Sequence, residues 1–350
     1  MITNRATDRT NASRVRVPDV GPDTVYCTLY QRDPGFFALA EAELSALVGG
    51  HAAELGVWLS STPVRWATCG YAKAGGRQLA YGRTLDDLRD ALAPLGIVAP
   101  RFSIATRRLP RRFKGASAAK TLIGDCIEGD VVLEDPELRL LLVVSAEGYR
   151  VLIDEDATPG EADWLRGSHK PHNYLVAIPV RIAKAMLNIT ARPGDSVLDP
   201  FCGSGTIPLL AAWAGHTAYG SDIGATCVAR ATENVAHFGQ TVTFACSDAR
   251  DTEQDADCIV SNLPYGVYCH LERDALAGVL ANLARRAARV TLVTSEHIED
   301  ALVAHGYTVE RVIPVESLRF ERFVYVTRSP RSTDRARATD HPRTRCASRG

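Results

Sequence analysis

Residues 196–206 read Ser-Val-Leu-Asp-Pro-Phe-Cys-Gly-Ser-Gly-Thr, and the expected architecture starts from them. Val197 and Leu198 are typical of the end of a short buried strand, which stops at Asp199. The glycines at 203 and 205 predict a tight loop, because glycine has no Cβ and lets the backbone turn sharply. A helix is predicted from Thr206 onward. A strand, a glycine turn and a helix make a nucleotide-type pocket at the carboxyl edge of a parallel sheet.

Two residues argue against a dinucleotide in this pocket. The dinucleotide fingerprint needs a third glycine three residues after the second, but Pro208 occupies that place. Asp199, just before the turn, would repel a pyrophosphate, whereas it suits a cation or hydroxyl and amine donors. S-adenosylmethionine supplies a sulfonium, an amino group and a ribose. The stretch therefore favours S-adenosylmethionine as the cofactor.

Three further predicted strands each end in a polar residue. Asp222 closes residues 218–222 and could accept both ribose hydroxyls. Asp248 closes residues 242–248 and could accept an adenine amine, and Asn262 follows the next strand. Each residue alone could be a simple loop or turn former. Together with Asp199 they fall at four successive strand ends, which favours one shared cleft and a methyltransferase.

The tip of the fourth strand reads Asn-Leu-Pro-Tyr-Gly over residues 262–266. It resembles the Asn/Asp-Pro-Pro-aromatic tetrad of the S-adenosylmethionine-dependent methyltransferases that modify exocyclic amines. With Leu263 in second place, the sequence is similar to the RNA guanine-N2 branch that carries an N-terminal THUMP domain. The resemblance covers roughly residues 101–325. It implies an α/β class I methyltransferase with a seven-stranded, Rossmann-like sheet, and an RNA substrate, with tRNA favoured.

The same resemblance assigns the site residues. The catalytic tetrad would be Asn262, Leu263, Pro264 and Tyr265. The cofactor would be held by the strand ends and the glycine loop, through Asp199, Phe201, Gly203, Gly205, Thr206, Asp222, Ile223, Asp248, Ala249 and Asn262. Residues 173–175, which precede the catalytic domain, would line one side of the pocket. His169 and His172 have no carboxylate or cysteine at ligand spacing, so no metal is expected.

The chemistry of the tetrad follows from the poor nucleophilicity of a guanine amine, whose lone pair is drawn into the ring. The Asn262 side-chain oxygen and the Leu263 carbonyl could both accept from the amine and stabilise its developing positive charge. Pro264 has a fixed φ and stiffens the loop. Tyr265 offers a flat face for the base, worth ~1–3 kcal/mol, once the base has left its stack.

Composition sets the broad class of the chain. It has 350 residues, 46% of them hydrophobic, which is enough for two or three domains. Its apolar runs are too short to span a bilayer, and the N-terminus lacks a secretory pattern, so a cytoplasmic protein is expected. Nine scattered cysteines without a C-x-x-C pair favour reduced thiols. The net charge of −1 means that any affinity for nucleic acid must come from local clusters.

Breaks in pattern predict six segments. They are a disordered N-terminus (1–22), a small α+β domain (23–98), a THUMP-like RNA-binding domain (99–158), a linker (159–178), the catalytic domain (179–328) and a basic disordered tail (329–350). The THUMP-like part shows a strand, a basic loop, a helix and a hairpin in that order. The loop is the candidate RNA contact, through Arg107, Arg108, Arg111, Arg112 and Lys114. A solvated loop is the simpler alternative.

Three hypotheses for the function stay open. The first is an RNA guanine-N2 methyltransferase acting on tRNA. The second keeps the chemistry but changes the target, to ribosomal RNA or to an adenine N6 amine. The third is an RNA-binding protein whose methyltransferase fold is inert. The intact residues Asp199, Gly203, Gly205 and Asn262 argue against the third.

Overall fold

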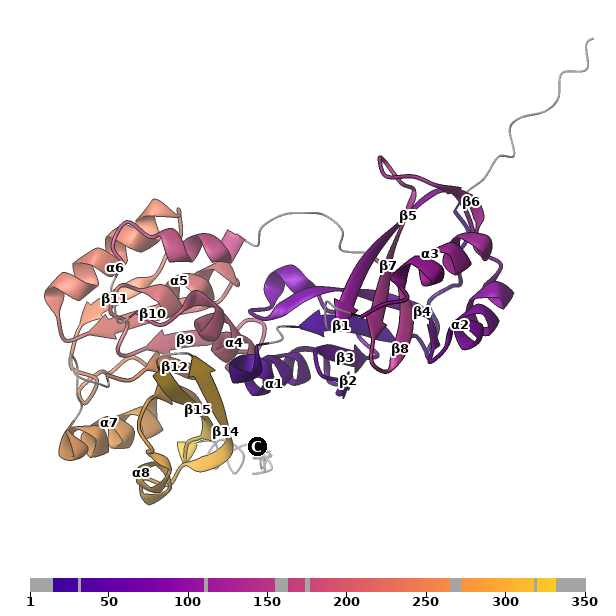
Figure 1. Ribbon diagram of the computed structural model, residues 1–350. Coiled ribbons are helices and arrows are strands. Elements are labelled where there is room, and N and C mark those ends of the chain that lie inside the picture. Colours follow the sequence, from indigo (N-terminus) through magenta and orange to yellow (C-terminus); the bar gives the residue numbers. More distant parts are fainter. Residues whose placement is uncertain are drawn as a thin grey trace, which may run out of the picture. The chain divides into compact units, whose positions relative to one another are not determined.

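The computed structural model describes residues 15–30, 33–109, 113–154, 163–173, 177–264, 272–317 and 320–331. They form two compact units (Figure 1). The first contains residues 15–30, 48–66, 72–109 and 113–154, and the second contains residues 33–47, 67–71 and those described from 163 onward. None of the helices in these ranges is long and apolar enough to cross a membrane.

The first unit is an eight-stranded sheet with strand order β2-β3-β1-β4-β8-β7-β5-β6. Its strands and helices are β1 (Tyr26–Tyr30), β2 (His51–Glu54), β3 (Val57–Ser60), β4 (Ala72–Gly82), α2 (Leu85–Leu92), β5 (Val98–Leu109), α3 (Ala116–Asp125), β6 (Glu128–Val131), β7 (Leu138–Ser145) and β8 (Gly148–Ile153). Thr84 caps the N-terminus of α2. Its hydroxyl accepts the Asp87 N–H at 3.1 Å, and the Asp87 carboxylate accepts the Thr84 N–H at 3.0 Å.

This sheet crosses the domain boundary expected at residue 98. Strand β4, from the expected N-terminal domain, pairs with β8 from the expected THUMP-like domain. Leu88 of α2 and Ile123 of α3 belong to one buried cluster with Leu140 and Leu142 of β7. Residues on both sides of position 98 therefore share one sheet and one hydrophobic core.

The second unit has the predicted seven-stranded sheet, in the order β11-β10-β9-β12-β13-β15-β14. Strands β9 to β13 are parallel, and the hairpin β14–β15 joins β13 in antiparallel pairing. Helices lie beside the sheet on its connections (Figure 1). The elements are α4 (Val180–Thr190), β9 (Ser196–Asp199), α5 (Thr206–Trp213), β10 (Thr217–Asp222), α6 (Ala225–His237), β11 (Thr243–Cys246), β12 (Cys258–Asn262), α7 (Arg273–Arg286), β13 (Arg289–Thr294), α8 (Glu299–Ala304), β14 (Thr308–Ser317) and β15 (Phe320–Arg328).

The second unit also contains a helix from the N-terminal part of the chain, α1 (Phe37–Val48). Glu43 of this helix is fully buried. Its carboxylate accepts the N–H groups of Gly70 at 2.7 Å and Tyr71 at 3.1 Å, and the Asn188 side-chain amide of α4 at 2.6 Å. Burial raises the pKa of Glu43 to about 6. The region expected as a separate N-terminal domain thus contributes to both units.

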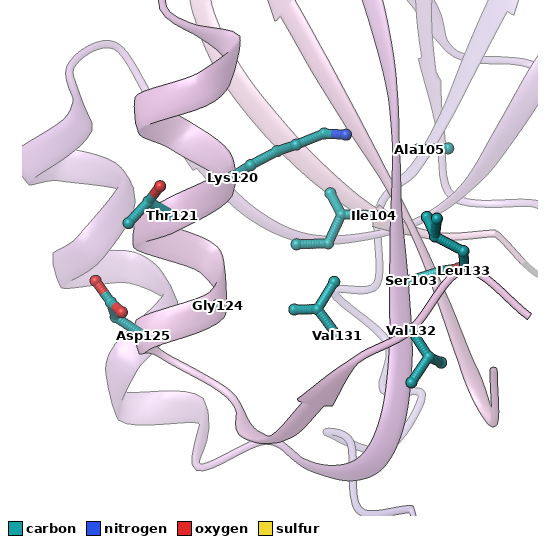
Figure 2. A pocket seen from close by; sticks show the side chains of 10 residues that line it. All are labelled: Ser103, Ile104, Ala105, Lys120, Thr121, Gly124, Asp125, Val131, Val132 and Leu133. Carbon is teal, nitrogen blue, oxygen red and sulfur yellow. The ribbon is translucent and has the colours of Figure 1, made fainter.

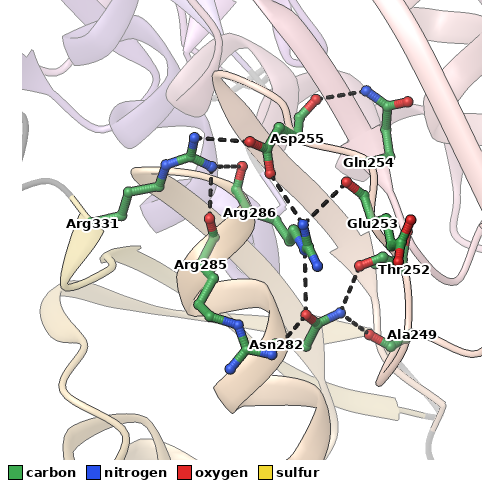
Figure 3. A network of polar contacts seen from close by, with 9 residues as sticks. All are labelled: Ala249, Thr252, Glu253, Gln254, Asp255, Asn282, Arg285, Arg286 and Arg331. Atoms are coloured by element: carbon green, nitrogen blue, oxygen red, sulfur yellow. Dashed lines mark hydrogen bonds and ion pairs between the residues drawn. The ribbon is translucent and has the colours of Figure 1, made fainter.

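The tail expected from residue 329 begins with ordered contacts. The Ser329 hydroxyl donates to the Ala287 carbonyl at 2.5 Å. Arg331 donates to the carbonyls of Arg285 and Arg286, both at 2.7 Å, and pairs with Asp255 at 3.0 Å (Figure 3). The folded part therefore extends at least to Arg331, and residues 332–350 lie outside the described residues.

Candidate active site

The strand order reverses direction between β9 and β12, and this point holds the centre of the candidate site. From β9 the chain proceeds outward to β10 and β11, and then crosses to β12 and β13 on the other side. Ligands of open α/β sheets bind at the carboxyl ends of the strands at such a switch point. Asp199 is the last residue of β9, Asp222 of β10 and Asn262 of β12. These three predicted site residues therefore lie at the carboxyl ends of three adjacent strands, on one edge of the sheet.

Hydrogen bonds link these strand ends directly. The Ser261 hydroxyl of β12 donates to Asp199 Oδ1 at 2.6 Å. The Gly203 N–H, in the loop after β9, donates to Asp222 Oδ2 at 3.0 Å. The switch point is thus bridged on both sides of β9, which fixes the two carboxylates relative to the glycine loop.

Asp199 is a buried carboxyl group, only 2% exposed. Its pKa is raised to about 7, chiefly by burial and to a smaller extent by nearby Asp222, although the bonds from Ser261 and the Phe201 N–H lower it. Oδ1 accepts both of those bonds, and Oδ2 has no partner among the described residues. A cationic ligand group would stabilise the ionised form of this carboxyl.

The glycine loop has the geometry that its sequence predicts. Gly203 (φ +51°) and Gly205 (φ +79°) both adopt left-handed conformations, which other residues rarely tolerate. A Cβ on Gly205 would also lie 3.0 Å from the Cβ of Ala231 in α6. Thr206 then begins α5. Cys202 is buried in this loop, and burial raises the pKa of its thiol, so it packs as a small hydrophobic residue.

Asp222 ends β10, and Ile223 follows it. Besides Gly203, the Asp222 carboxylate accepts the Gly224 N–H at 2.9 Å through Oδ1. Two backbone donors leave further lone pairs on this carboxylate, so it can still accept from ribose hydroxyls. Ile223 is 72% exposed, which is unusual for a large apolar side chain beside a buried sheet edge.

Asp248, the predicted acceptor for the adenine amine, already has a donor within the chain. Its carboxylate accepts from Arg250 Nη2 at 2.7 Å and from Arg250 Nε at 3.1 Å. Arg250 thereby holds the pKa of Asp248 below its ordinary range. An adenine amine would have to share this carboxylate with Arg250. The pairing gives the carboxylate a partner that the position of Asp248 after a strand did not predict.

The segment after Asp248 is tied to α7 by a polar network (Figure 3). Asn282 is buried, and its side-chain amide donates to the carbonyls of Ala249 at 3.0 Å and Thr252 at 2.9 Å. Its oxygen accepts from Arg285 at 3.1 Å and Arg286 at 3.3 Å. The backbone of the predicted cofactor residue Ala249 is therefore fixed to α7 through the Asn282 side chain.

The tip of β12 contains an acceptor without a donor. Asn262 Oδ1 is buried and has no hydrogen-bond partner in the part of the chain that the structure describes. Leu263 is 2% exposed, and its N–H donates to the Val293 carbonyl at 3.0 Å, which fixes the loop to β13. Pro264 follows, half-buried. Tyr265, the fourth residue of the predicted tetrad, lies outside the described residues.

Unpartnered polar atoms gather at this edge of the sheet. Six buried side-chain atoms lack a partner among the described residues, and three belong to strand ends or the glycine loop: Ser204 Oγ, Ser221 Oγ and Asn262 Oδ1. A buried polar group without a partner costs about 1–3 kcal/mol. The edge therefore fits a ligand rich in hydroxyl and amine groups, such as S-adenosylmethionine.

Two residues that the sequence analysis did not select also contact the glycine loop. Lys170 is 5% exposed, and its Nζ donates to Thr206 Oγ1. Asn234 of α6 is fully buried and joins the His172 backbone to the Ser204 carbonyl. Little in the sequence indicated these contacts, apart from the polar, proline-bearing character of the linker that contains Lys170. Asn173 donates to the Ser168 carbonyl at 3.3 Å, and residues 174–176 lie outside the described residues.

The candidate RNA residues lie in the first unit. Arg107 and Arg108 are exposed residues of β5, where they pair with Val143 and Val144 of β7, and do not lie in a loop as predicted. Lys114 follows this strand, and Arg111 and Arg112 lie outside the described residues. The same unit has a pocket of about 530 Å³ between β5, α3 and the segment after β6 (Figure 2). Its lining includes Lys120 and the exposed Leu133, and none of the predicted cofactor residues.

The part of the chain that carries this edge is similar to known proteins. Residues 169–299 match the family model of the RMKL-like methyltransferase domain. The chain is 37% identical over 195 residues to a tRNA (guanine(10)-N2)-dimethyltransferase of Methanothermobacter thermautotrophicus, covering 52% of this chain and 57% of that protein. It is 29% identical over 301 residues to a tRNA (guanine(6)-N2)-methyltransferase of Thermus thermophilus, covering 75% and 87%.

The coverage of these relatives is uneven. The chain spans 57% of the Methanothermobacter protein and 36% of a Pyrococcus abyssi protein of the same name. Among solved structures, TrmN from Thermus thermophilus matches with a TM-score of 0.49 at 22% identity, over 87% of this chain and 99% of that one. The family match covers the glycine loop, all four strand ends and the tetrad. Residues 169–299 are therefore similar to the RMKL-like methyltransferase domain in the part of the chain that carries the candidate site.

Proposed function

We propose that this protein transfers a methyl group from S-adenosylmethionine to the exocyclic N2 amine of a guanosine in tRNA. The observation that carries the proposal is the buried, unpartnered Asn262 Oδ1 beside the buried Asp199 at the switch point of a methyltransferase sheet, both among the described residues. The names of the relatives, which are tRNA guanine-N2 methyltransferases, support guanine and tRNA. An enzyme acting on tRNA works where that RNA is, which we take to be the cytoplasm.

In this proposal the chain supplies position and electrostatics, and the cofactor supplies the methyl group. Asn262 Oδ1 and the Leu263 carbonyl accept from the guanine amine and stabilise the positive charge that develops on nitrogen. Asp222 holds the ribose hydroxyls. Asp199 holds the amino group of the methionine part. The guanine has to leave its stack to reach this edge, and Tyr265 supplies the face against which it packs.

The decisive experiment is nucleoside analysis of unmodified tRNA after incubation with the protein and methyl-labelled cofactor. We expect the label in N2-methylguanosine or N2,N2-dimethylguanosine. Label in an adenine nucleoside, or in ribosomal RNA alone, would support the second hypothesis. No label on any RNA offered, with S-adenosylhomocysteine still bound, would support an inert fold.

The first unit is proposed to bind the RNA as a THUMP-like domain through the basic residues at the end of β5 and just after it. We expect the double variant Arg107→Glu, Arg108→Glu to weaken tRNA binding. The salt dependence of binding should also flatten, by about 0.7–0.9 in slope for each phosphate that the variant no longer neutralises. The measurement is the dissociation constant for tRNA as a function of KCl concentration.

A charge reversal elsewhere in the same unit serves as the control for this prediction. Arg89 on α2 is exposed and pairs with Asp86 at 3.0 Å, away from the basic end of β5 in the sequence. Arg89→Glu should leave the salt slope unchanged. If the double variant has the slope of the wild type, the RNA surface lies elsewhere on the protein.

A further inference from the structure

Lys170 is a buried cation without a carboxylate partner among the described residues. Its side chain is nine-tenths buried, and Thr206 Oγ1 is the single partner of its ammonium group in that part of the chain. Lysine is rarely buried unless it is paired with an anion. Burial lowers the pKa of Lys170 to about 8, and no neighbouring charge within the described residues offsets this shift. By contrast, the buried Lys184 on α4 has the carboxylate of Glu43 nearby.

The Lys170 ammonium lies at the N-terminus of α5, which itself has a positive potential. Thr206 is the first residue of α5, an eight-residue helix, and the N–H groups at a helix start carry partial positive charge. A cation is unfavourable at this end of a helix. Ser204, two residues earlier, is 3% exposed, and its hydroxyl has no partner among the described residues. The ammonium, the helix start and the hydroxyl together are suited to an anion.

The segment that carries Lys170 is fixed to the same loop. Asn234 Oδ1 accepts the His172 N–H at 2.8 Å, while its amide group donates to the carbonyls of His172 and Ser204, both at 2.9 Å. The His172 ring also pairs with Glu233 at 2.5 Å. Lys170 is therefore held against the glycine loop independently of its own hydrogen bond.

The opposite charge is available at the other end of this loop. The glycine turn lies between Asp199 and Thr206. The buried Asp199 carboxyl stands at the start of this eight-residue stretch, and the buried Lys170 ammonium contacts its last residue, Thr206. An α-amino acid carries its ammonium and carboxylate on one carbon and needs both kinds of partner. We propose that Lys170, with Thr206 and Ser204, binds the α-carboxylate of the methionine part of the cofactor, an inference that rests on the proposed function.

The test measures binding and needs no turnover. Isothermal titration compares S-adenosylhomocysteine with S-adenosyl-3-thiopropylamine, which lacks only the carboxylate. The wild-type protein should bind the first roughly 10- to 100-fold more tightly, as expected for hydrogen bonds to a charged group. Lys170→Met should remove that difference by weakening only S-adenosylhomocysteine. Lys184→Met is the matched control, because it also removes a buried lysine, and should change neither affinity.

Each other outcome has a distinct meaning. Equal wild-type affinity for the two ligands would overturn the inference without any variant. An equal loss of affinity for both ligands in Lys170→Met would make Lys170 a structural contact of the linker and overturn it as well. Loss of tRNA binding alone would assign Lys170 to an RNA phosphate and also overturn the inference. If the wild-type protein binds neither ligand, the proposed function itself fails.

Discussion

Asn262→Ala is expected to lower the rate of methyl transfer by roughly 10²–10³-fold, the usual effect of removing one group that stabilises transition-state charge. The affinity for S-adenosylhomocysteine should not change. The reason lies in the state of Oδ1, which is buried and has no donor among the described residues. Such an acceptor destabilises the free protein, so its removal should leave the melting temperature unchanged or raise it.

The measurement is the single-turnover rate with saturating tRNA and cofactor, beside a titration with S-adenosylhomocysteine. Asn262→Asp is the conservative variant. It keeps an acceptor oxygen of the same reach and should retain more activity than Asn262→Ala. A variant that loses cofactor binding in proportion to its rate would show that Asn262 holds the cofactor and not the base.

The second unit follows closely from the sequence because its signals are local. A strand that ends in Asp199, two glycines and a helix specify a βα turn, and left-handed φ values at Gly203 and Gly205 explain why glycine stands there. Parallel pairing then brings Asp222 and Asn262 to the same edge without any further information. The predicted sheet and edge therefore depend on short-range pattern and on one topological rule.

The features that sequence alone missed depend on contacts between distant residues. The sequence separation between Glu43 and Asn188 is 145 residues, and no local pattern assigns α1 to the second unit. Lys170 is separated from Thr206 by 36 residues and reads as an ordinary linker cation until its burial is known. Arg250 lies only two residues after Asp248, but a carboxylate after a strand gives no sign of which donor it will meet.

Cofactor affinity is expected to depend steeply on pH because of Asp199. Its pKa is raised to about 7, so the carboxyl is largely protonated below that pH and cannot pair with the ammonium of the cofactor. Affinity for S-adenosylhomocysteine should rise about tenfold per pH unit from about pH 5 to 7 and then level off. Asp199→Asn should abolish this dependence and weaken binding roughly 30- to 1000-fold at about pH 7.5, as for a lost buried charge pair.

The raised pKa of Asp199 also affects stability. Ionisation of Asp199 favours cofactor binding but destabilises the folded protein. The unfolded chain releases the Asp199 proton near 3.8, whereas the native protein keeps it to about 7, so ionisation destabilises the native state as pH rises through this window. Asp199→Asn should therefore be more stable than the wild type by about 1–3 kcal/mol at about pH 7.5 and equally stable near pH 4.

Asp248→Asn is the control for both measurements. Arg250 holds the pKa of Asp248 below its ordinary range, so this variant should keep the wild-type pH slope. A flat wild-type profile between about pH 5 and 7 would mean that no ammonium group of the ligand reaches Asp199.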